Sequence, residues 1–186
     1  MQVGIRTLLL AAVLATIPSV PATAQAQAET LVPVEFPPSP GKKVLGWVER
    51  IRLLPGNTVM KAKLDPGANS SVIHAEEIEA FDKDGQRMVR FTLLVDHDDP
   101  DSARIVMERE FVRRVAIKLR NTTRRDRRPV VRLDFCLAGE LYQGMFSLTN
   151  RSNFNYPVLL GRRFLSDKVL VDSSVSFTQK TGCPDA

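Results

Sequence analysis

The residue best placed to do chemistry in this chain is Asp65, which ends an apolar-alternating run and directly precedes a glycine-containing turn, Asp65-Pro66-Gly67. A carboxylate presented at a strand end can activate water when a second carboxylate faces it, because two such groups a few ångströms apart share one proton. The sequence has one Asp-x-Gly followed by small residues at an expected strand end, so the second carboxylate has to come from a twin subunit. The alternative is structural, since Asp-Pro-Gly is a favourable turn sequence in any β protein.

Strand-like segments surround this aspartate. Apolar and polar residues alternate through most of the chain after residue 42, which is the period-two pattern of half-buried strands. The predicted strands are 44–53, 58–65, 89–95, 110–119, 130–137, 141–149 and a short final pair at 169–172 and 175–177. Short helical turns are expected at 75–81 and 162–167. Many short strands at regular spacing predict an all-β protein, a small closed or nearly closed barrel.

The first residues have the composition of an export signal. Arg6 is the only charge before an apolar segment at 8–14, and Ala22-Thr23-Ala24 offers a small-residue cleavage site. The apolar segment is shorter than the roughly 20 residues that span a bilayer. We therefore expect a signal peptide at 1–24 (cleavage as late as 28), a proline-rich extended leader at 25–41 and one barrel domain at 42–186. The expected location is periplasmic or secreted, with no stable membrane insertion after cleavage.

Other motifs accompany the aspartate in a fixed order: Gly46-Trp47-Val48-Glu49 before it, His74-Ala75 after its turn, and Leu159-Leu160-Gly161 far downstream. Together they resemble the bacterial retropepsin-like aspartic peptidases, a family also labelled ATP-dependent zinc proteases. The resemblance covers most of the predicted domain. It implies a small acid-protease barrel that forms a two-fold homodimer and carries a flap between Phe91 and Arg128.

The resemblance also implies roles for single residues. Asp65 of each subunit is expected to activate water, while Gly67 and Ala68 shape the active-site loop. Leu160 and Gly161 are expected to buttress that loop from behind.

Pro66 departs from the family pattern, which has threonine at this position. The threonine hydroxyl hydrogen-bonds across the two-fold axis, and proline has neither that hydroxyl nor a backbone N–H. The proline ring favours extended backbone angles at Asp65, which a strand end tolerates. The carboxylate can therefore still be presented.

From the resemblance, the chain is predicted to be an aspartic endopeptidase that acts on peptides. A non-catalytic module that binds peptides in the same cleft stays open as the alternative, as does a monomeric structural protein of the cell envelope.

Basic residues concentrate between Arg113 and Arg128, although the formal net charge of the whole sequence is only +5. Such a cluster can bind an acidic, glutamate-rich peptide through charge-assisted hydrogen bonds, an anionic polymer of the cell envelope, or nucleic acid. The alternative is a solvated loop with charged flanks. Export argues against nucleic acid as a partner. The candidate substrate-binding residues are Arg124, Arg125, Arg127 and Arg128.

Cysteines and histidines are few. Cys136 and Cys183 allow one disulfide in an oxidising compartment, although the sequence gives no distance between them. Zinc needs three or four convergent ligands, whereas His74 is expected to pack and His97 to lie in a solvated acidic turn. There is no Walker loop, so we expect neither a cofactor nor a metal.

Overall fold

The computed structural model describes residues 41–56, 58–96, 99, 101–118, 123–180 and 182–183. The expected signal peptide, all but the end of the expected leader, and His97 lie outside these residues, so those expectations stay predictions. Within the described part of the chain, no helix is long and apolar enough to cross a membrane.

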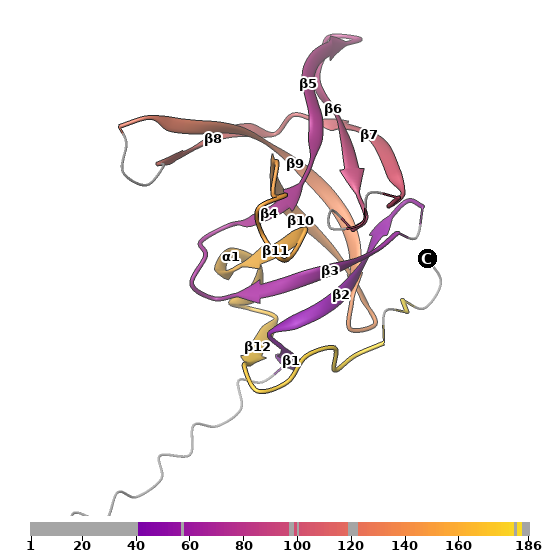
Figure 1. Cartoon of the computed structure of the whole chain (residues 1–186), viewed down its shortest axis with the longest axis vertical. Coiled ribbons are helices and arrows are strands. Elements are labelled where there is room, and N and C mark those ends of the chain that lie inside the picture. Colours follow the sequence, from indigo (N-terminus) through magenta and orange to yellow (C-terminus); the bar gives the residue numbers. More distant parts are fainter. Residues whose placement is uncertain are drawn as a thin grey trace, which may run out of the picture. The chain divides into compact units, whose positions relative to one another are not determined.

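Six strands close into a barrel, which confirms the predicted all-β architecture (Figure 1). The order around the barrel is β10, β4, β11, β3, β2 and β9, and the ring is completed because β9 also pairs with β10. Strand β11 lies between β3, to which it is parallel, and β4, to which it is antiparallel. The barrel strands are β2 (Val48–Leu54), β3 (Thr58–Asp65), β4 (Ser71–His74), β9 (Arg125–Leu137), β10 (Glu140–Thr149) and β11 (Val158–Gly161).

Smaller elements extend the barrel. Strand β8 pairs with the first part of β9 and forms a hairpin that projects from the barrel (Figure 1). Strands β5, β6 and β7 form a separate antiparallel sheet, and β1 pairs in parallel with β12. These elements are β1 (Lys43–Gly46), β5 (Glu76–Lys83), β6 (Gln86–Leu94), β7 (Arg104–Glu110), β8 (Arg113–Lys118), α1 (Arg162–Leu165) and β12 (Val169–Asp172).

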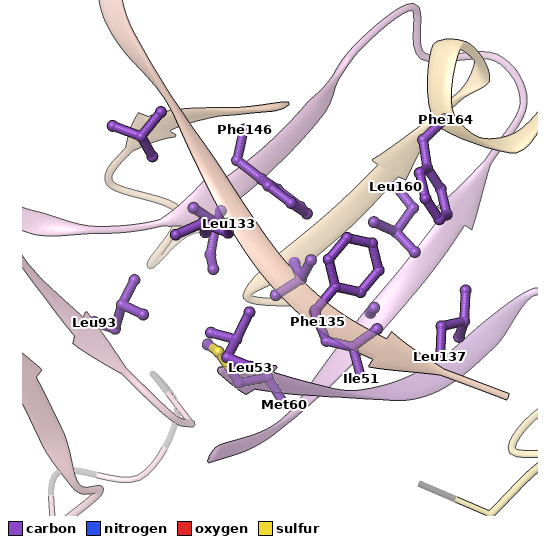
Figure 2. Packing of buried hydrophobic residues seen from close by; sticks show 14 of the residues in the cluster. Ile51, Leu53, Met60, Leu93, Leu133, Phe135, Leu137, Phe146, Leu160 and Phe164 are labelled. Carbon is purple, nitrogen blue, oxygen red and sulfur yellow. The ribbon is translucent and has the colours of Figure 1, made fainter. Parts of the chain in front are cut away.

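The alternation of apolar residues along the strands fills the barrel interior. In β3, Met60 and Leu64 are each only 1 % exposed. Phe135 of β9 is the centre of an aromatic cluster, with its ring centroid 5.5 Å from that of Phe146 and 5.2 Å from that of Phe164 (Figure 2). Each fully buried side chain of this kind stabilises the fold by roughly 1.5–3 kcal/mol. The core therefore fixes β3 and its neighbours, which are the strands that carry Asp65.

The predicted helical turn at 75–81 is wrong, because these residues enter β5, which pairs with β6. The hairpin turns at Asp84 and Gly85, whose φ angles of 51° and 77° are both positive, as a two-residue hairpin loop requires. A helical segment of this length is marginal in isolation, whereas the hairpin supplies a ladder of hydrogen bonds. The other predicted helical turn is confirmed as α1, which is shorter than expected.

The C-terminal tail lies along residues 46–48 and forms no strand there, so the predicted strand at 175–177 is wrong. Its backbone still pairs locally, because Trp47 N–H donates to the Val175 carbonyl at 3.1 Å. The buried Glu49 carboxylate secures the tail by accepting a hydrogen bond from Thr178 N–H at 2.9 Å. Further along, a disulfide joins Cys136 of β9 to Cys183, with their Cα atoms 5.8 Å apart. The tail is thus held at two points on the barrel.

The β9–β10 hairpin has an unfavourable residue in its turn. Ala138 and Gly139 are its central residues, with φ angles of 52° and 79°, and a non-glycine residue in the left-handed region costs roughly 1–2 kcal/mol. Asparagine tolerates this region better than alanine. We expect Ala138→Asn to raise the free energy of unfolding by about 1 kcal/mol, measured by urea denaturation.

Asp84→Asn is the matched control, because Asp84 occupies the same place in the β5–β6 hairpin and already favours that conformation. It should leave stability nearly unchanged. A loss of stability in Ala138→Asn would show that turn conformation does not limit this hairpin.

Candidate active site

Asp65 is the last residue of β3, and β11 sets its position. The two strands run parallel, and their register places Gly161 beside Asp65. On its other side β11 pairs with β4, the strand in which the chain continues after the aspartate. Residues 66–70 therefore have to cross the end of β11 to reach β4 (Figure 1). This crossing forms the loop that presents the carboxylate.

The crossing leaves no room for a side chain at Gly161. A Cβ atom there would lie 2.5 Å from the backbone carbonyl carbon of Ser70 and 2.6 Å from its oxygen, well inside normal van der Waals separation. Gly161 N–H also donates to Ser71 Oγ at 3.1 Å. Leu160 is fully buried behind the loop. Leu160 and Gly161 therefore lie where a buttress is predicted.

Hydrogen bonds from the start of α1 hold the main chain of the loop. Arg162 N–H donates to the Ala68 carbonyl at 2.7 Å, and Arg163 N–H donates to the Asn69 carbonyl at 3.1 Å. The Arg162 side chain also donates from Nη1 to the Pro66 carbonyl at 3.0 Å. None of these bonds uses the side chain of residue 66.

Among the described residues, the Asp65 carboxylate has one hydrogen bond and one ion pair. Gly67 N–H donates to its Oδ1 at 3.0 Å, and Lys63 Nζ lies 3.3 Å from its Oδ2. The side chain remains 26 % exposed, so one side of the carboxylate is open to a ligand or to a second subunit. Lys63 precedes Asp65 by two positions and therefore lies on the same face of the strand, so the spacing in the sequence already places a cation beside the carboxylate.

A cleft of about 420 Å³ opens beside the carboxylate. Asp65 is the only acidic residue among the described residues that line it. Both polar and aromatic side chains form its walls, as is typical of a ligand-binding cleft. The lining residues are Trp47, Lys63, Asp65, Arg151, Asn153, Phe154, Asn155, Tyr156 and Leu159.

Arg151 is the functional candidate that the sequence does not reveal. It is buried, with 7 % of the residue exposed, and its Nε donates to the Tyr156 carbonyl at 3.1 Å. Burial lowers the pKa of the guanidinium, the positive charge of Arg128 lowers it further, and the negative charge of Asp65 acts in the opposite direction. Arg151 thus places a fixed donor group in the cleft beside the aspartate.

His74 supports this arrangement. Its Nδ1 accepts a hydrogen bond from Arg151 N–H at 2.9 Å, and its Nε2 lies 3.6 Å from Glu76 Oε1. Among the residues that the structure describes, no group of three or more histidine, cysteine or acidic side chains could hold a metal ion. His74 therefore positions the backbone of Arg151.

The arginines suggested as substrate-binding residues lie on or next to the β8–β9 hairpin, within the range expected for a flap. None of the four is among the described residues that line the Asp65 cleft. Arg127 and Arg128 border a separate hollow, and Arg128 Nε pairs with Asp126 at 2.6 Å. Their predicted contact with substrate, and the role of this hairpin as a flap, stay predictions.

The barrel is closed, and β11 lies between β3 and β4, the two strands that the aspartate loop joins. This arrangement is that of the retropepsin-like class of proteins. Residues 44–182 match the RimB-like family, which is described as retropepsin-like aspartic endopeptidase RimB. The chain belongs to this family, which confirms the resemblance drawn from its motifs.

Curated relatives are longer proteins that contain a segment similar to this chain. A probable alpha-L-glutamate ligase of Shewanella pealeana is 37 % identical over 124 residues, which are 66 % of this chain and 26 % of that protein. One from Parasynechococcus marenigrum is 32 % identical over 134 residues, 70 % of this chain and 28 % of that protein. The chain thus spans about a quarter of these relatives.

A solved structure is also similar. The crystal structure of Lpg0085, a protein of unknown function from Legionella pneumophila, matches with a TM-score of 0.63 and 35 % identity. The match covers 74 % of this chain and 98 % of that one.

The crossing at Gly161 can be tested by adding one methyl group. We expect Gly161→Ala to lower the free energy of unfolding by about 1–3 kcal/mol, because the Ser70 backbone has to move to admit the Cβ atom. Urea denaturation measures this change. Gly182→Ala is the control, since a Cβ at Gly182 would meet nothing within 4 Å. Equal stability of the two variants would contradict the tight crossing.

Proposed function

We propose that this protein is an aspartic endopeptidase whose active site forms when two copies of the chain bring their Asp65 carboxylates together. The observation that carries the proposal is a single carboxylate, held by Gly67 N–H at 3.0 Å and open on one side, in a cleft with no second acid among its described lining residues. One chain supplies half of a paired-carboxylate site. A two-fold homodimer supplies the rest.

The chemistry follows from the two protonation states of such a pair. The ionised carboxylate takes a proton from water as the water oxygen attacks the peptide carbonyl carbon, and the protonated partner donates its proton to the carbonyl oxygen. The tetrahedral intermediate then breaks its C–N bond as the nitrogen accepts a proton. The products are a carboxylic acid and an amine. In each subunit, Gly67 N–H orients the Asp65 carboxylate throughout the reaction.

A second candidate function is peptide binding without cleavage, and Pro66 is the observation that favours it. Proline can donate no hydrogen bond across a two-fold axis. A misplacement of about 1 Å in a catalytic site can cost about a hundredfold in rate. The same cleft would then hold a peptide that it does not hydrolyse.

We also propose that the protein works outside the cytoplasm. The expected signal segment supports this location, and so does the Cys136–Cys183 disulfide, because disulfides persist in oxidising compartments.

Acidic peptides are the substrates that the charges of the cleft favour. Lys63 and Arg151 are its cations, and Asp65 is its only acid among the described lining residues. An acidic side chain bound next to the scissile bond gains charge-assisted hydrogen bonds from them. The names of the relatives, probable alpha-L-glutamate ligases, are compatible with glutamate-rich peptides as substrates.

Cleavage of peptides tests the proposal directly. Wild-type protein is expected to hydrolyse glutamate-rich peptides between pH 3 and 8, detected by mass spectrometry, and Asp65→Asn to abolish cleavage because it removes the ionisable carboxylate. Pro66→Thr is expected to raise the rate by restoring a hydroxyl at the loop. Cleavage that survives Asp65→Asn would refute an aspartic mechanism, and silence from wild type and Pro66→Thr would favour the binding module.

The charge preference can be tested in the same assay with Lys63→Gln. This variant should lower kcat/KM for a glutamate-rich peptide about threefold to fivefold relative to its glutamine counterpart, the range of a partly exposed ion pair. Lys61→Gln is the matched control, because Lys61 lies in the same strand but pairs with Asp96 outside the cleft. Equal effects of the two substitutions would show that overall charge, not the cleft, sets the preference.

A further inference from the structure

A second hollow, of about 340 Å³, lies beside the exit of the aspartate loop. It brings together residues from the loop exit, β8, β10, α1 and the turn after α1. Its floor includes the buried ring of Phe164. The described lining residues are Ser70, Ser71, Arg113, Gln143, Gly144, Met145, Arg163, Phe164 and Lys168.

Three of these residues are cations and, among the described lining residues, none is an acid. Arg113 and Arg163 form no ion pair with any described residue. The ammonium of Lys168 lies 5.4 Å from the centroid of the Phe164 ring, a contact that leaves its charge unneutralised. Like charges gathered around one hollow repel each other, and a bound anion removes this cost.

Some arginines elsewhere in the protein are paired with acids. Arg90, for example, binds Glu108 with Nη2 2.8 Å from Oε1. Gln143, which lines the hollow, donates a hydrogen bond from its Nε2 to Asp134 at 2.9 Å. Asp134 itself does not line the hollow. The hollow differs from these sites because it gathers three cations with no acid among its described lining residues.

We infer that this hollow binds carboxylate side chains of an acidic peptide. A guanidinium offers two parallel N–H donors that match the two oxygens of a carboxylate. The two arginines come from different elements, β8 and α1, and line the same hollow. The Phe164 ring and the Met145 side chain offer apolar contact to the methylene groups of a glutamate.

The inference rests on the proposed function, because it assigns the hollow as an outer part of the same substrate site. Ser70 follows Asp65 by five residues, and five extended residues span at most about 17 Å. The hollow therefore begins within about 17 Å of Asp65, a distance that about five residues of an extended peptide can span. Arg113 is the first residue of β8, so an occupied hollow also links the β8–β9 hairpin to α1.

Binding to the Asp65→Asn protein tests the inference separately from catalysis. The probe is a fluorescent glutamate-rich peptide of about ten residues, measured by anisotropy beside its glutamine counterpart. We expect Arg113→Gln and Arg163→Gln each to weaken binding about threefold to tenfold, and the double variant more, because each loses a charge-assisted contact. Arg87→Gln is the control, since it removes an equal charge from the β5–β6 hairpin, where Arg87 pairs with Asp82.

Several outcomes overturn the inference. Undetectable binding does so, as does equal weakening by Arg87→Gln, which would indicate only long-range attraction. Displacement by inorganic phosphate as readily as by unlabelled peptide would assign the hollow to a small anion. Tighter binding of an oligonucleotide would assign it to nucleic acid. If the peptide binds as expected but wild-type protein cleaves nothing, the proposed peptidase function fails while the peptide site stands.

Discussion

The close crossing of the Ser70 backbone over Gly161 is the constraint on which the site depends. Strand β11 can lie between β3 and β4 only if the connection between those two strands passes over its end. With a hydrogen atom in place of a side chain, the two backbones approach until Gly161 N–H can bond Ser71 Oγ. Barrel closure and the position of Asp65 are therefore decided at the same point, and a change that opens the crossing disturbs both.

Buried polar groups give the cleft its second constraint. A buried charge is costly unless it is hydrogen-bonded and compensated, and Arg151 meets this condition through the Tyr156 carbonyl and the charge of Asp65. His74, fully buried below it, accepts the Arg151 backbone N–H. The segment after β10 is thus fixed by contacts with the strand that follows the aspartate loop. Its arginine can offer donors to a ligand without first paying the entropy of ordering a free surface side chain.

The sequence predicts the parts of this structure that local pattern determines. The alternation that ends at Asp65 gives β3 with its observed bounds. The helical turn expected at 75–81 fails because pairing with β6 outweighs local preference. Arg113 and Arg163 are 50 positions apart, and neither carries a local signal that both line one hollow. Such convergence is a property of barrel closure, so it becomes visible only in three dimensions.

Pro66 has a narrower effect than its place in the motif suggests. Within one chain, the loop is held by Gly67 N–H on the carboxylate and by the first two N–H groups of α1 on the loop carbonyls. A proline at position 66 removes none of these bonds, and its carbonyl accepts a further one from the Arg162 side chain. Within one subunit, none of the hydrogen bonds that hold the loop depends on the side chain of residue 66. In the proposed homodimer, the consequences of Pro66 fall on the contact between subunits, because the missing hydroxyl cannot help to align the two carboxylates. Catalysis by the proposed dimer would therefore depend on how the second chain is held.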